Sequence, residues 1–422
     1  MNLLRRRLAT ALGSYGATAL GIAGTIVAAN VLGVADFGRL ALVLATVALF
    51  QLLLDLTSEE ALVKYGFRYA EGQDWGRFRR LFELAFGLKS ASALVAGGLI
   101  GALAPASDAL FDVDLTAPLL VASPLPLLYS FEGTAAAALL LRGRYDVRAF
   151  FLFVSMALRL VAIVIGTQHG VTATVVALVL AQVVATAVLS SIGLAALLRF
   201  PRVARVPLAE DRREIVGFVL QSSLGTGIVS VRAWIAQLLL GVVSTVSQVG
   251  LFRAAQAPQQ GLGALSSPVR LILLTEQTRQ WERGRPDAVL AGLRRYTIGA
   301  AALMAVAVPV FWVLMPWLFE LILPDYEDAV DAARIVLLAG AIQLVYGWSK
   351  SLPISIGRPN LRVVAHGIET VVLVPLLVVL GREWGATGAA FAVLASTVVF
   401  AAVWTVLLAR IRAHPPVQVS AA

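Results

Sequence analysis

Twelve long apolar runs constrain what this sequence can fold into. A helix that crosses a membrane needs about 20 mostly apolar residues, and such runs lie at 8–33, 39–57, 81–104, 117–141, 149–166, 171–198, 215–241, 250–273, 296–322, 330–354, 361–380 and 385–409. Charged residues make up only 14% of the 422 residues, whereas a soluble domain carries about 25%. The sequence therefore predicts an all-α membrane protein with twelve transmembrane helices. Pro258 and Pro268 make the eighth run the weakest of the twelve.

The distribution of basic residues fits this count of helices. If the N-terminus lies in the cytoplasm and the helices alternate, the cytoplasmic segments hold 25 Lys and Arg, and the opposite side holds only Arg39 and Arg382. Cytoplasmic loops of membrane proteins carry such an excess of positive charge. We therefore expect a multi-pass protein of the cytoplasmic membrane with both termini in the cytoplasm. The net charge of +9 then follows from topology and does not indicate a nucleic-acid partner.

The chain also contains an internal duplication. The loop Gly143–Arg148 (GRYDVR) returns as Gly357–Arg362 (GRPNLR) at an offset of 214. Residues 36–38 correspond to 248–250, and residues 170–172 correspond to 385–387, at offsets of 212 and 215. Several matches at nearly one offset indicate a repeated unit of about 210 residues.

Two halves of six helices each enter the membrane from the same side. Such parallel repeats are related by an axis along the membrane normal, and alternating access arises when one half rocks against the other. We therefore predict two parallel-repeat six-helix bundles around a central cleft: an N-terminal bundle at 1–199, a cytoplasmic linker at 200–214 and a C-terminal bundle at 215–422.

Polar stripes mark the first helix of each half. At 100° per residue, three hydroxyl residues of the first run share one face, and polar residues of the seventh run share another. A polar stripe on a spanning helix must face protein or water, because lipid cannot satisfy it. Ordinary helix packing also uses Ser, Thr and Gly, so both readings remain open. The candidates for the cleft are Ser14, Thr18, Thr25, Thr226, Ser230 and Gln237.

Several ionisable residues lie within the apolar runs. A charge at the bilayer centre costs about 2.5–3.5 kcal/mol on insertion scales, so it usually faces a cavity or a partner. The basic candidates are Arg232, Arg253, Lys89 and Arg159. The acidic ones are Glu132 and Glu369.

Two interpretations fit the acidic pair. Glu132 could form a structural ion pair with Lys89 or Arg159. Glu369 has no obvious basic partner in its own helix region, so it could bind and release a proton or a sodium ion, as ion coupling requires.

The sequence lacks the residues for several other chemistries. It has no cysteine and only three scattered histidines, which argues against a metal site. No phosphate-binding loop, nucleophile elbow or zinc-protease motif is present. We therefore expect no cofactor, no metal and no enzymatic activity.

The repeated turns give the sequence a resemblance to a known family. Val31–Arg39 (VLGVADFGR) and its echo Ser247–Ala255 (SQVGLFRAA), together with twelve helices in two halves, resemble the multidrug/oligosaccharidyl-lipid/polysaccharide (MOP) exporter superfamily, in its polysaccharide-transporter or oligosaccharide-flippase branch. The resemblance covers essentially the whole chain. In that family, a Leu-Gly-x-x-x-Phe/Tyr-Gly turn joins the first two helices of each half.

The resemblance implies a flippase that moves a polyprenyl-pyrophosphate-linked oligosaccharide outward for surface polysaccharide assembly. The implied partners are this lipid-linked oligosaccharide, coupling H⁺ or Na⁺, membrane lipids and other polysaccharide-assembly proteins. An anionic head fits a cleft that carries cations, because charge-assisted hydrogen bonds from arginine bind phosphate strongly. Arg232 and Arg253 are the first candidates for this role, followed by Lys89 and Arg159.

Other functions are alternatives. An ion-coupled multidrug exporter of the same superfamily would favour a mostly acidic cleft. A flippase for the peptidoglycan precursor often carries additional helices. A major-facilitator transporter would show a Gly-x-x-x-Asp-Arg-x-Gly-Arg signature after the second helix, where this chain reads Glu71–Arg77 (EGQDWGR). A membrane enzyme acting on the same lipids would need a large outer loop, and none is present.

Overall fold

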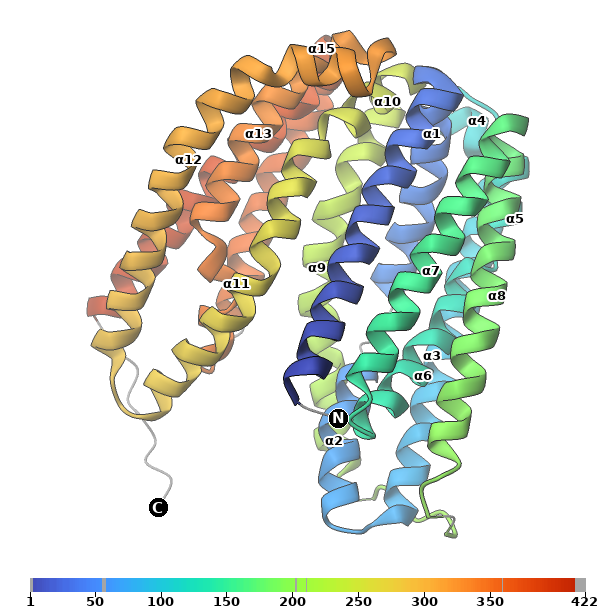
Figure 1. Ribbon diagram of the computed structural model, residues 1–422, viewed down its shortest axis with the longest axis vertical. Coiled ribbons are helices and arrows are strands. Elements are labelled where there is room, and N and C mark those ends of the chain that lie inside the picture. The colour runs from blue at the N-terminus through green and yellow to red at the C-terminus, as the bar shows by residue number, and fades with distance from the viewer. Residues whose placement is uncertain (1–2, 55–57, 202, 210, 359, 414–422) are drawn as a thin grey trace. The chain divides into compact units, whose positions relative to one another are not determined.

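The computed structural model describes residues 3–54, 58–201, 203–209, 211–358 and 360–413, and this part of the chain is helical with short connections (Figure 1). The chain divides into two compact units, Met1–Trp234 and Ile235–Ala422. The division falls within one helix, downstream of the linker expected at 200–214, so the domain boundaries drawn from the repeat remain a prediction.

The described part of the N-terminal unit forms nine α-helices, the last of which continues into the second unit. They are α1 (Leu3–Leu54), α2 (Ser58–Glu71), α3 (Trp75–Leu103), α4 (Ser107–Phe111), α5 (Thr116–Ala122), α6 (Leu125–Leu141), α7 (Tyr145–Gly166), α8 (Val171–Leu197) and α9 (Arg212–Val243), with 3₁₀ turns η1 (Ala104–Ala106) and η2 (Thr167–His169). Helix α7 packs between α1 and α8, and α6 packs against α3 and α8 (Figure 1).

The rest of the C-terminal unit is built around α13. Its elements are α10 (Val246–Ala255), α11 (Ala257–Glu282), α12 (Pro286–Ile322), α13 (Val330–Val345), α14 (Leu352–Ser355) and α15 (Asn360–Ala413), with 3₁₀ turns η3 (Pro324–Ala329) and η4 (Gly347–Lys350). Helix α13 contacts α10, α11, α12 and α15. Trp348, Trp404 and Phe400 are buried together in one of its cores.

The described helices are compatible with the twelve spans expected from the sequence. In the described part of the chain, seven helices are long and apolar enough to cross a membrane. Two of these, α1 and α15, each contain a glycine with non-helical backbone angles, Gly33 and Gly385, so each can provide two spans. Helix α9, the pair α10–α11 and the pair α13–α14 supply the remaining three segments. The weak eighth run is indeed broken, at Gln256.

Close packing of α1 on α7 depends on small residues. A Cβ atom at Gly13 would lie 2.7 Å from the carbonyl oxygen of Ala149, and one at Gly16 would lie 2.8 Å from the ring of Phe153. Transmembrane helices approach closely where such small residues line the contact. These glycines therefore hold α7 along the first span, beside the polar stripe of α1.

The repeated loops have the same backbone structure in both units. Gly143 and Gly357 have φ values of 65° and 70°. In each turn the glycine N–H donates to the carbonyl three residues back, and the next N–H donates to the carbonyl five residues back, over 2.8–3.1 Å. This pattern is a Schellman motif, which closes a helix with a left-handed residue. The duplication seen in the sequence is thus present in the conformation.

A second pair of Schellman turns has no sequence similarity to reveal it. Gln73 and Gly284, at an offset of 211, have φ values of 54° and 69° and the same two hydrogen bonds. Glutamine carries a Cβ atom, which makes this conformation unfavourable for it by about 1–2 kcal/mol. The N-terminal unit therefore keeps the turn without the glycine that relieves its strain.

The expected linker packs against the N-terminal unit. Residues 203–209 together with Asp211, here called the strap, connect α8 to α9 and contact α2 and α3. The N–H of Val206 donates to Gly76 O at 3.3 Å, and the Tyr69 hydroxyl donates to Asp211 Oδ2 at 2.7 Å. Leu208 is buried among Tyr65, Tyr69 and Phe78.

The strain at Gln73 leads to a stability prediction. Gln73→Gly should raise the free energy of unfolding by about 0.5–1 kcal/mol, because relief of the left-handed strain outweighs the extra entropy of the unfolded chain. Gly143→Ala isolates the backbone effect, because its added Cβ atom meets nothing within 4 Å. This variant should lower the free energy of unfolding by about 1–2 kcal/mol. Denaturant unfolding of the purified protein in detergent measures both. A lower midpoint for Gln73→Gly would contradict the assignment.

Candidate functional site

The N-terminal unit encloses a cavity of about 440 Å³ among its spanning helices. Four charged side chains line it, and they come from α2, α3, α6 and α7. Uncharged polar groups of α1 and α6 complete the wall. The lining residues with ionisable or hydrogen-bonding side chains are Ser14, Gln51, Glu59, Lys89, Tyr129, Glu132 and Arg148, and this space is called the N-terminal cavity below.

A glycine makes room for the lysine of the cavity. Lys89 is only 9% exposed. A Cβ atom at Gly133 would lie 2.7 Å from Lys89 Nζ and 3.5 Å from Glu59 Oε2. The ammonium group of Lys89 and the carboxylate of Glu59 therefore both lie against α6 at Gly133, which has no side chain. Glu59 also accepts a hydrogen bond from Arg148 Nη2 at 3.1 Å.

Glu132 is held by a neutral partner. Gln182 on α8 donates to Glu132 Oε2 at 2.8 Å and to Thr186 Oγ1 at 3.1 Å. The sequence suggested an ion pair between Glu132 and Lys89 or Arg159. The structure brings Lys89 to the same cavity, whereas Arg159, half-buried on α7, forms no hydrogen bond or ion pair within the described residues. Gln182 was missed, although a glutamine inside an apolar run is a visible signal.

The hydroxyl stripe of α1 serves the helix as well as the cavity. Ser14 is exposed and lines the N-terminal cavity. Thr18 donates to Ser14 O and Thr25 donates to Gly21 O, both at 3.0 Å. Threonine hydroxyls in helices commonly bond this way to the carbonyl one turn back. Of the three, Ser14 lies on the wall of the N-terminal cavity.

A polar cluster joins α9 and α10 in the C-terminal unit. Gln237 is 1% exposed and donates to Gln256 Oε1 at 2.8 Å. Arg253 Nη1 lies 3.4 Å from the same oxygen and donates to it. Two residues singled out in the sequence thus share one acceptor. The side chains of the neighbouring candidates Thr226, Ser230 and Arg232 lie outside the described part of the structure.

Glu369 has a basic partner, contrary to the expectation from sequence. His366 Nδ1 lies 2.9 Å from Glu369 Oε2, and the two side chains are 6% and 1% exposed. The imidazole stacks on Phe400, with ring centroids 5.0 Å apart. The partner was missed because only lysine and arginine were considered, yet residues three apart on a helix lie side by side.

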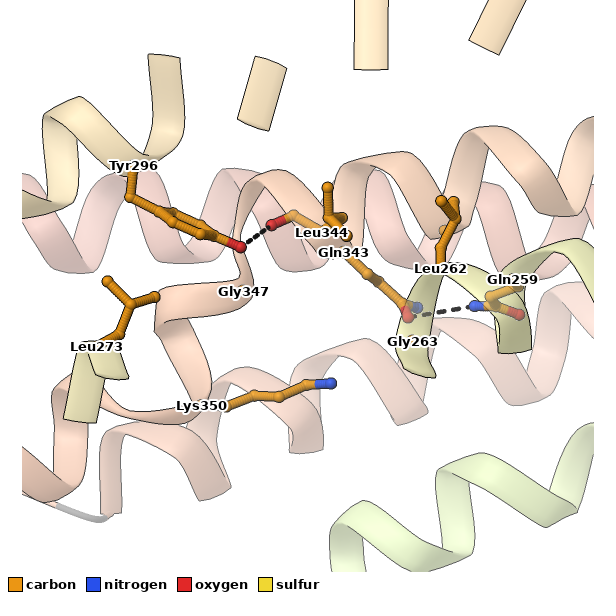
Figure 2. Close-up of a pocket in the computed structure, with 10 residues that line it drawn as sticks. Gln259, Leu262, Gly263, Leu273, Tyr296, Gln343, Leu344, Gly347 and Lys350 are labelled. Carbon is orange, nitrogen blue, oxygen red and sulfur yellow. Dashed lines mark hydrogen bonds between the residues drawn. The ribbon is translucent and has the colours of Figure 1, made fainter. Parts of the chain in front are cut away.

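A small pocket of about 80 Å³ lies between α11, α12 and α13 (Figure 2). Gln259 Nε2 donates to Gln343 Oε1 at 3.2 Å, and the Tyr296 hydroxyl donates to Leu344 O at 2.7 Å. Figure 2 shows Lys350 extending along the pocket, with its ammonium end directed toward the side where Gln259 and Gln343 lie. The two glutamines, like Gln182, are polar residues of spanning segments that the sequence reading passed over.

Both units therefore hold hydrogen-bonding and ionisable side chains inside segments that cross the membrane. Such groups are costly in hydrocarbon and usually mark a substrate or ion pathway. Within the described residues, no cluster of His, Asp and Glu could hold a metal ion. The chemistry available is binding by carboxylate, imidazole, guanidinium and amide groups, and proton exchange by the carboxylate and imidazole groups.

Sequence comparison decides the family. The profile of the family described as "Polysaccharide biosynthesis protein" matches residues 3–269. The chain belongs to this polysaccharide biosynthesis family. No curated protein matches the chain.

Solved structures show which fold this family member adopts. An inward-facing multidrug resistance MATE transporter of that superfamily matches with a TM-score of 0.67 and 14% identity, covering 99% of this chain and 97% of its own. The lipid II flippase MurJ, in an inward closed conformation, matches with a TM-score of 0.74 and 10% identity, covering 95% and 87%. At these identities, the likeness establishes the fold. The resemblance to the MOP exporters read from the sequence is confirmed.

The glycine beside Lys89 leads to a test of the cavity. Gly133→Ala should displace the ammonium group of this family member, because a methyl group occupies its place. Labelling of Lys89 by an amine-reactive acetylating reagent, followed by mass spectrometry with exposed Lys64 as internal reference, should then become several-fold faster. Gly87→Ala on α3, where a Cβ atom meets nothing within 4 Å, is the control. Unchanged labelling in Gly133→Ala would contradict the geometry.

The buried His366–Glu369 pair leads to a second test. His366→Phe removes one partner of a buried carboxylate and should lower the free energy of unfolding by about 1–3 kcal/mol. Replacing both residues, as His366→Phe with Glu369→Leu, should recover most of the loss, because apolar groups then fill the site. Denaturant unfolding of both variants in detergent measures this coupling. Equal destabilisation in the single and double variants would show that the contact contributes nothing.

Proposed function

We propose that this MOP-fold member of the polysaccharide biosynthesis family is a flippase for lipid-linked oligosaccharide. It would carry a polyprenyl-pyrophosphate-linked sugar outward across the cytoplasmic membrane by alternating access, for the assembly of a surface polysaccharide. The N- and C-termini would lie in the cytoplasm, on the side of the basic loops. The protein would act as a transporter without catalysing a covalent reaction.

The observation that carries this proposal is the N-terminal cavity, a charged space inside a bundle that hydrocarbon surrounds. Lys89, Arg148 and Glu59 meet there at the wall formed by Gly133. The head of a lipid-linked oligosaccharide is anionic and rich in hydroxyl groups, so it needs ionic and hydrogen-bonding partners to leave water. Its prenyl tail can stay in the lipid.

Different residues would contact different parts of this head. Arg232, Arg253, Lys89 and Arg159 would bind phosphate or acidic sugars through charge-assisted hydrogen bonds. Sugar hydroxyl groups would exchange hydrogen bonds with the side chains of Ser14, Thr18, Thr25, Thr226, Ser230 and Gln237. Gln237 and Arg253 both donate to the same oxygen of Gln256. This geometry supports a site at which a phosphate and a sugar hydroxyl group would bind side by side.

Glu132 and Glu369 would couple transport to an ion gradient of H⁺ or Na⁺. Glu132 faces a cavity, and its partner Gln182 can hydrogen-bond to either the charged or the protonated form. Glu369 is fully buried beside His366, and a coupling proton would be shared between the carboxylate and the imidazole. A bound Na⁺ would substitute for the proton at the carboxylate.

A deletion strain tests the proposal. Without the protein, surface polysaccharide should be lost, and the lipid-linked unit should accumulate on the cytoplasmic face. Complementation with the wild type should restore both. Normal glycans together with new sensitivity to cationic dyes would instead favour the multidrug-exporter alternative.

Arginine variants in the same strain test the binding residues. Arg232→Ala and Arg253→Ala should each reduce polymer export about 10-fold or more, since a lost charge-assisted hydrogen bond corresponds to about 1.5–3 kcal/mol. Membrane abundance should remain normal. Arg39→Ala is the control, because Arg39 is 45% exposed and pairs with Asp36 on its own helix. Full export by Arg232→Ala would remove that residue from the site.

A carboxylate variant tests coupling separately. Glu369→Gln keeps the shape and one hydrogen bond to His366 but cannot exchange a proton or bind a cation. Export should then lose its dependence on the ion gradient and on external pH. An unchanged pH profile, at normal abundance, would count against Glu369 as the coupling residue.

A further inference from the structure

A second hollow of about 700 Å³ lies in the N-terminal unit, apart from the residues assigned to transport. Helices α3, α6 and α8 and the segment after α8 form its walls. Its volume is within the range of about 300–1,000 Å³ that is typical of ligand pockets. Its lining is mainly apolar, and it is called the phenylalanine groove after Phe78, Phe82, Phe86, Phe131 and Phe200.

The groove is open along one side. Phe86 is 40% exposed and Leu194 is 55% exposed at its edges. The rings of Phe86 and Phe131 lie 5.4 Å apart, and those of Phe78 and Phe200 lie 4.8 Å apart. Because α3, α6 and α8 are long and apolar enough to span a membrane, a flexible apolar chain of a lipid is the material available to fill this opening.

One end of the groove carries concentrated positive charge. Arg79, Arg80 and Arg205 converge on the carboxylate of Glu83, at 3.0, 3.8 and 3.6 Å. These three arginines, here called the arginine mouth, outnumber the single carboxylate that they share. Their side chains are between 37% and 62% exposed, so they remain accessible to a further anion.

A fourth guanidinium group lies at this end of the groove. Arg142 lies over the ring of Phe200 at 4.0 Å from its centroid and donates to Ala196 O at 3.3 Å. Glu83 and Arg79 line the groove itself. The apolar hollow and the cationic mouth are therefore continuous parts of one surface.

We propose that the groove binds an acidic phospholipid of the adjoining leaflet, with one acyl chain along the phenylalanines and its phosphate at the arginine mouth. Arginine binds phosphate through directed, charge-assisted hydrogen bonds. The excess of guanidinium over carboxylate groups disfavours the cationic headgroup of a zwitterionic lipid and favours an anionic one such as phosphatidylglycerol.

The bound lipid links α3 to the strap. Arg205 belongs to the strap, and Arg79 donates to the strap carbonyl of Val203 at 3.3 Å. From there the strap continues to Asp211, which accepts a hydrogen bond from Tyr69. A phosphate that bridges Arg79 and Arg205 thus strengthens the contact of the strap with α2 and α3.

The start of α9 is fastened by the same network. Glu214 accepts hydrogen bonds from Arg68 at 3.1 Å and from Tyr65 at 3.2 Å. The hydrogen bond from Arg68 holds the pKa of Glu214 below its usual range, so the carboxylate is anionic at neutral pH. An acidic lipid at the mouth therefore stabilises the beginning of the helix that leads into the second unit.

Photocrosslinking of the purified full-length chain in lipid nanodiscs tests the site. A phosphatidylglycerol probe with a diazirine on one acyl chain is added to phosphatidylcholine discs, and crosslinked peptides are mapped by mass spectrometry. We expect labelling within 78–86, 131–138 and 190–201. Unlabelled phosphatidylglycerol should compete, and added phosphatidylcholine should not.

Variants of the mouth give effects in opposite directions. The double variant Arg79→Gln with Arg205→Gln should reduce groove labelling about tenfold, because two phosphate contacts are lost. Glu83→Gln should increase it several-fold, because the carboxylate that competes with the lipid phosphate is removed. A purely structural role for this cluster would lower labelling in both cases.

Two further variants test the part of the groove that would hold the acyl chain and provide a control. Leu194→Trp places a bulky ring at the exposed edge of the groove and should reduce labelling while leaving the mouth unchanged. Arg279→Gln removes an exposed arginine of the C-terminal unit, whose nearest acidic partner is Glu276 at 3.9 Å, and should have no effect. Only variants with the thermal midpoint of the wild type in pure phosphatidylcholine discs are compared.

Several results would overturn the proposal. Equal competition by phosphatidylcholine would mean that the groove holds bulk lipid without selecting a headgroup. Competition by a polyprenyl phosphate alone would identify it as a site for the substrate tail. Crosslinks confined to other helices would exclude the groove. None of these outcomes depends on whether the protein exports a glycan, so this test is independent of the proposed function.

Discussion

The interior of a membrane offers no hydrogen-bond partner to a peptide group, and this constraint shapes the whole chain. Every spanning segment must satisfy its own backbone, so the described residues form helices, and each helix end must be closed locally. Schellman turns at Gln73, Gly143, Gly284 and Gly357 provide this closure at corresponding places of the two halves. The turns are better preserved in conformation than in residue type.

Polar side chains in spanning helices also lack partners in the lipid, and they bond to one another instead. Glu132 is paired with Gln182, Glu369 with His366, and Gln237 with Gln256. Each contact joins groups within one unit, so the polar residues of a spanning helix need not face lipid. A carboxylate that is paired in this way is held in place by a partner from the protein itself.

Much of the fold could be predicted from the sequence, because apolar length and basic loops report directly on the membrane. The MOP superfamily fold also followed from short turns that the sequence repeats. Long-range pairings could not be predicted: Arg148 and Glu59 are 89 positions apart and meet only after α2 and α7 are packed. The contact between His366 and Glu369 was within reach, since a spacing of three is local information. The sequence identifies the strap only as part of a basic cytoplasmic linker, because its packing depends on where Tyr69 and Gly76 lie in the folded unit.

The two pairs of matching turns have different offsets, 211 at Gln73 and Gly284 but 214 at Gly143 and Gly357. The C-terminal half therefore contains three more residues between its two turns than the N-terminal half. The helix bounds locate this insertion: Phe111 and Ile322, where the preceding helices end, differ by 211, and Thr116 and Val330, where the next helices begin, differ by 214. The three residues therefore lengthen the connection that contains η3 and leave the helices of the two halves in the same register. A position on a helix of one half thus has a definite counterpart in the other, and the difference in length is confined to the connection.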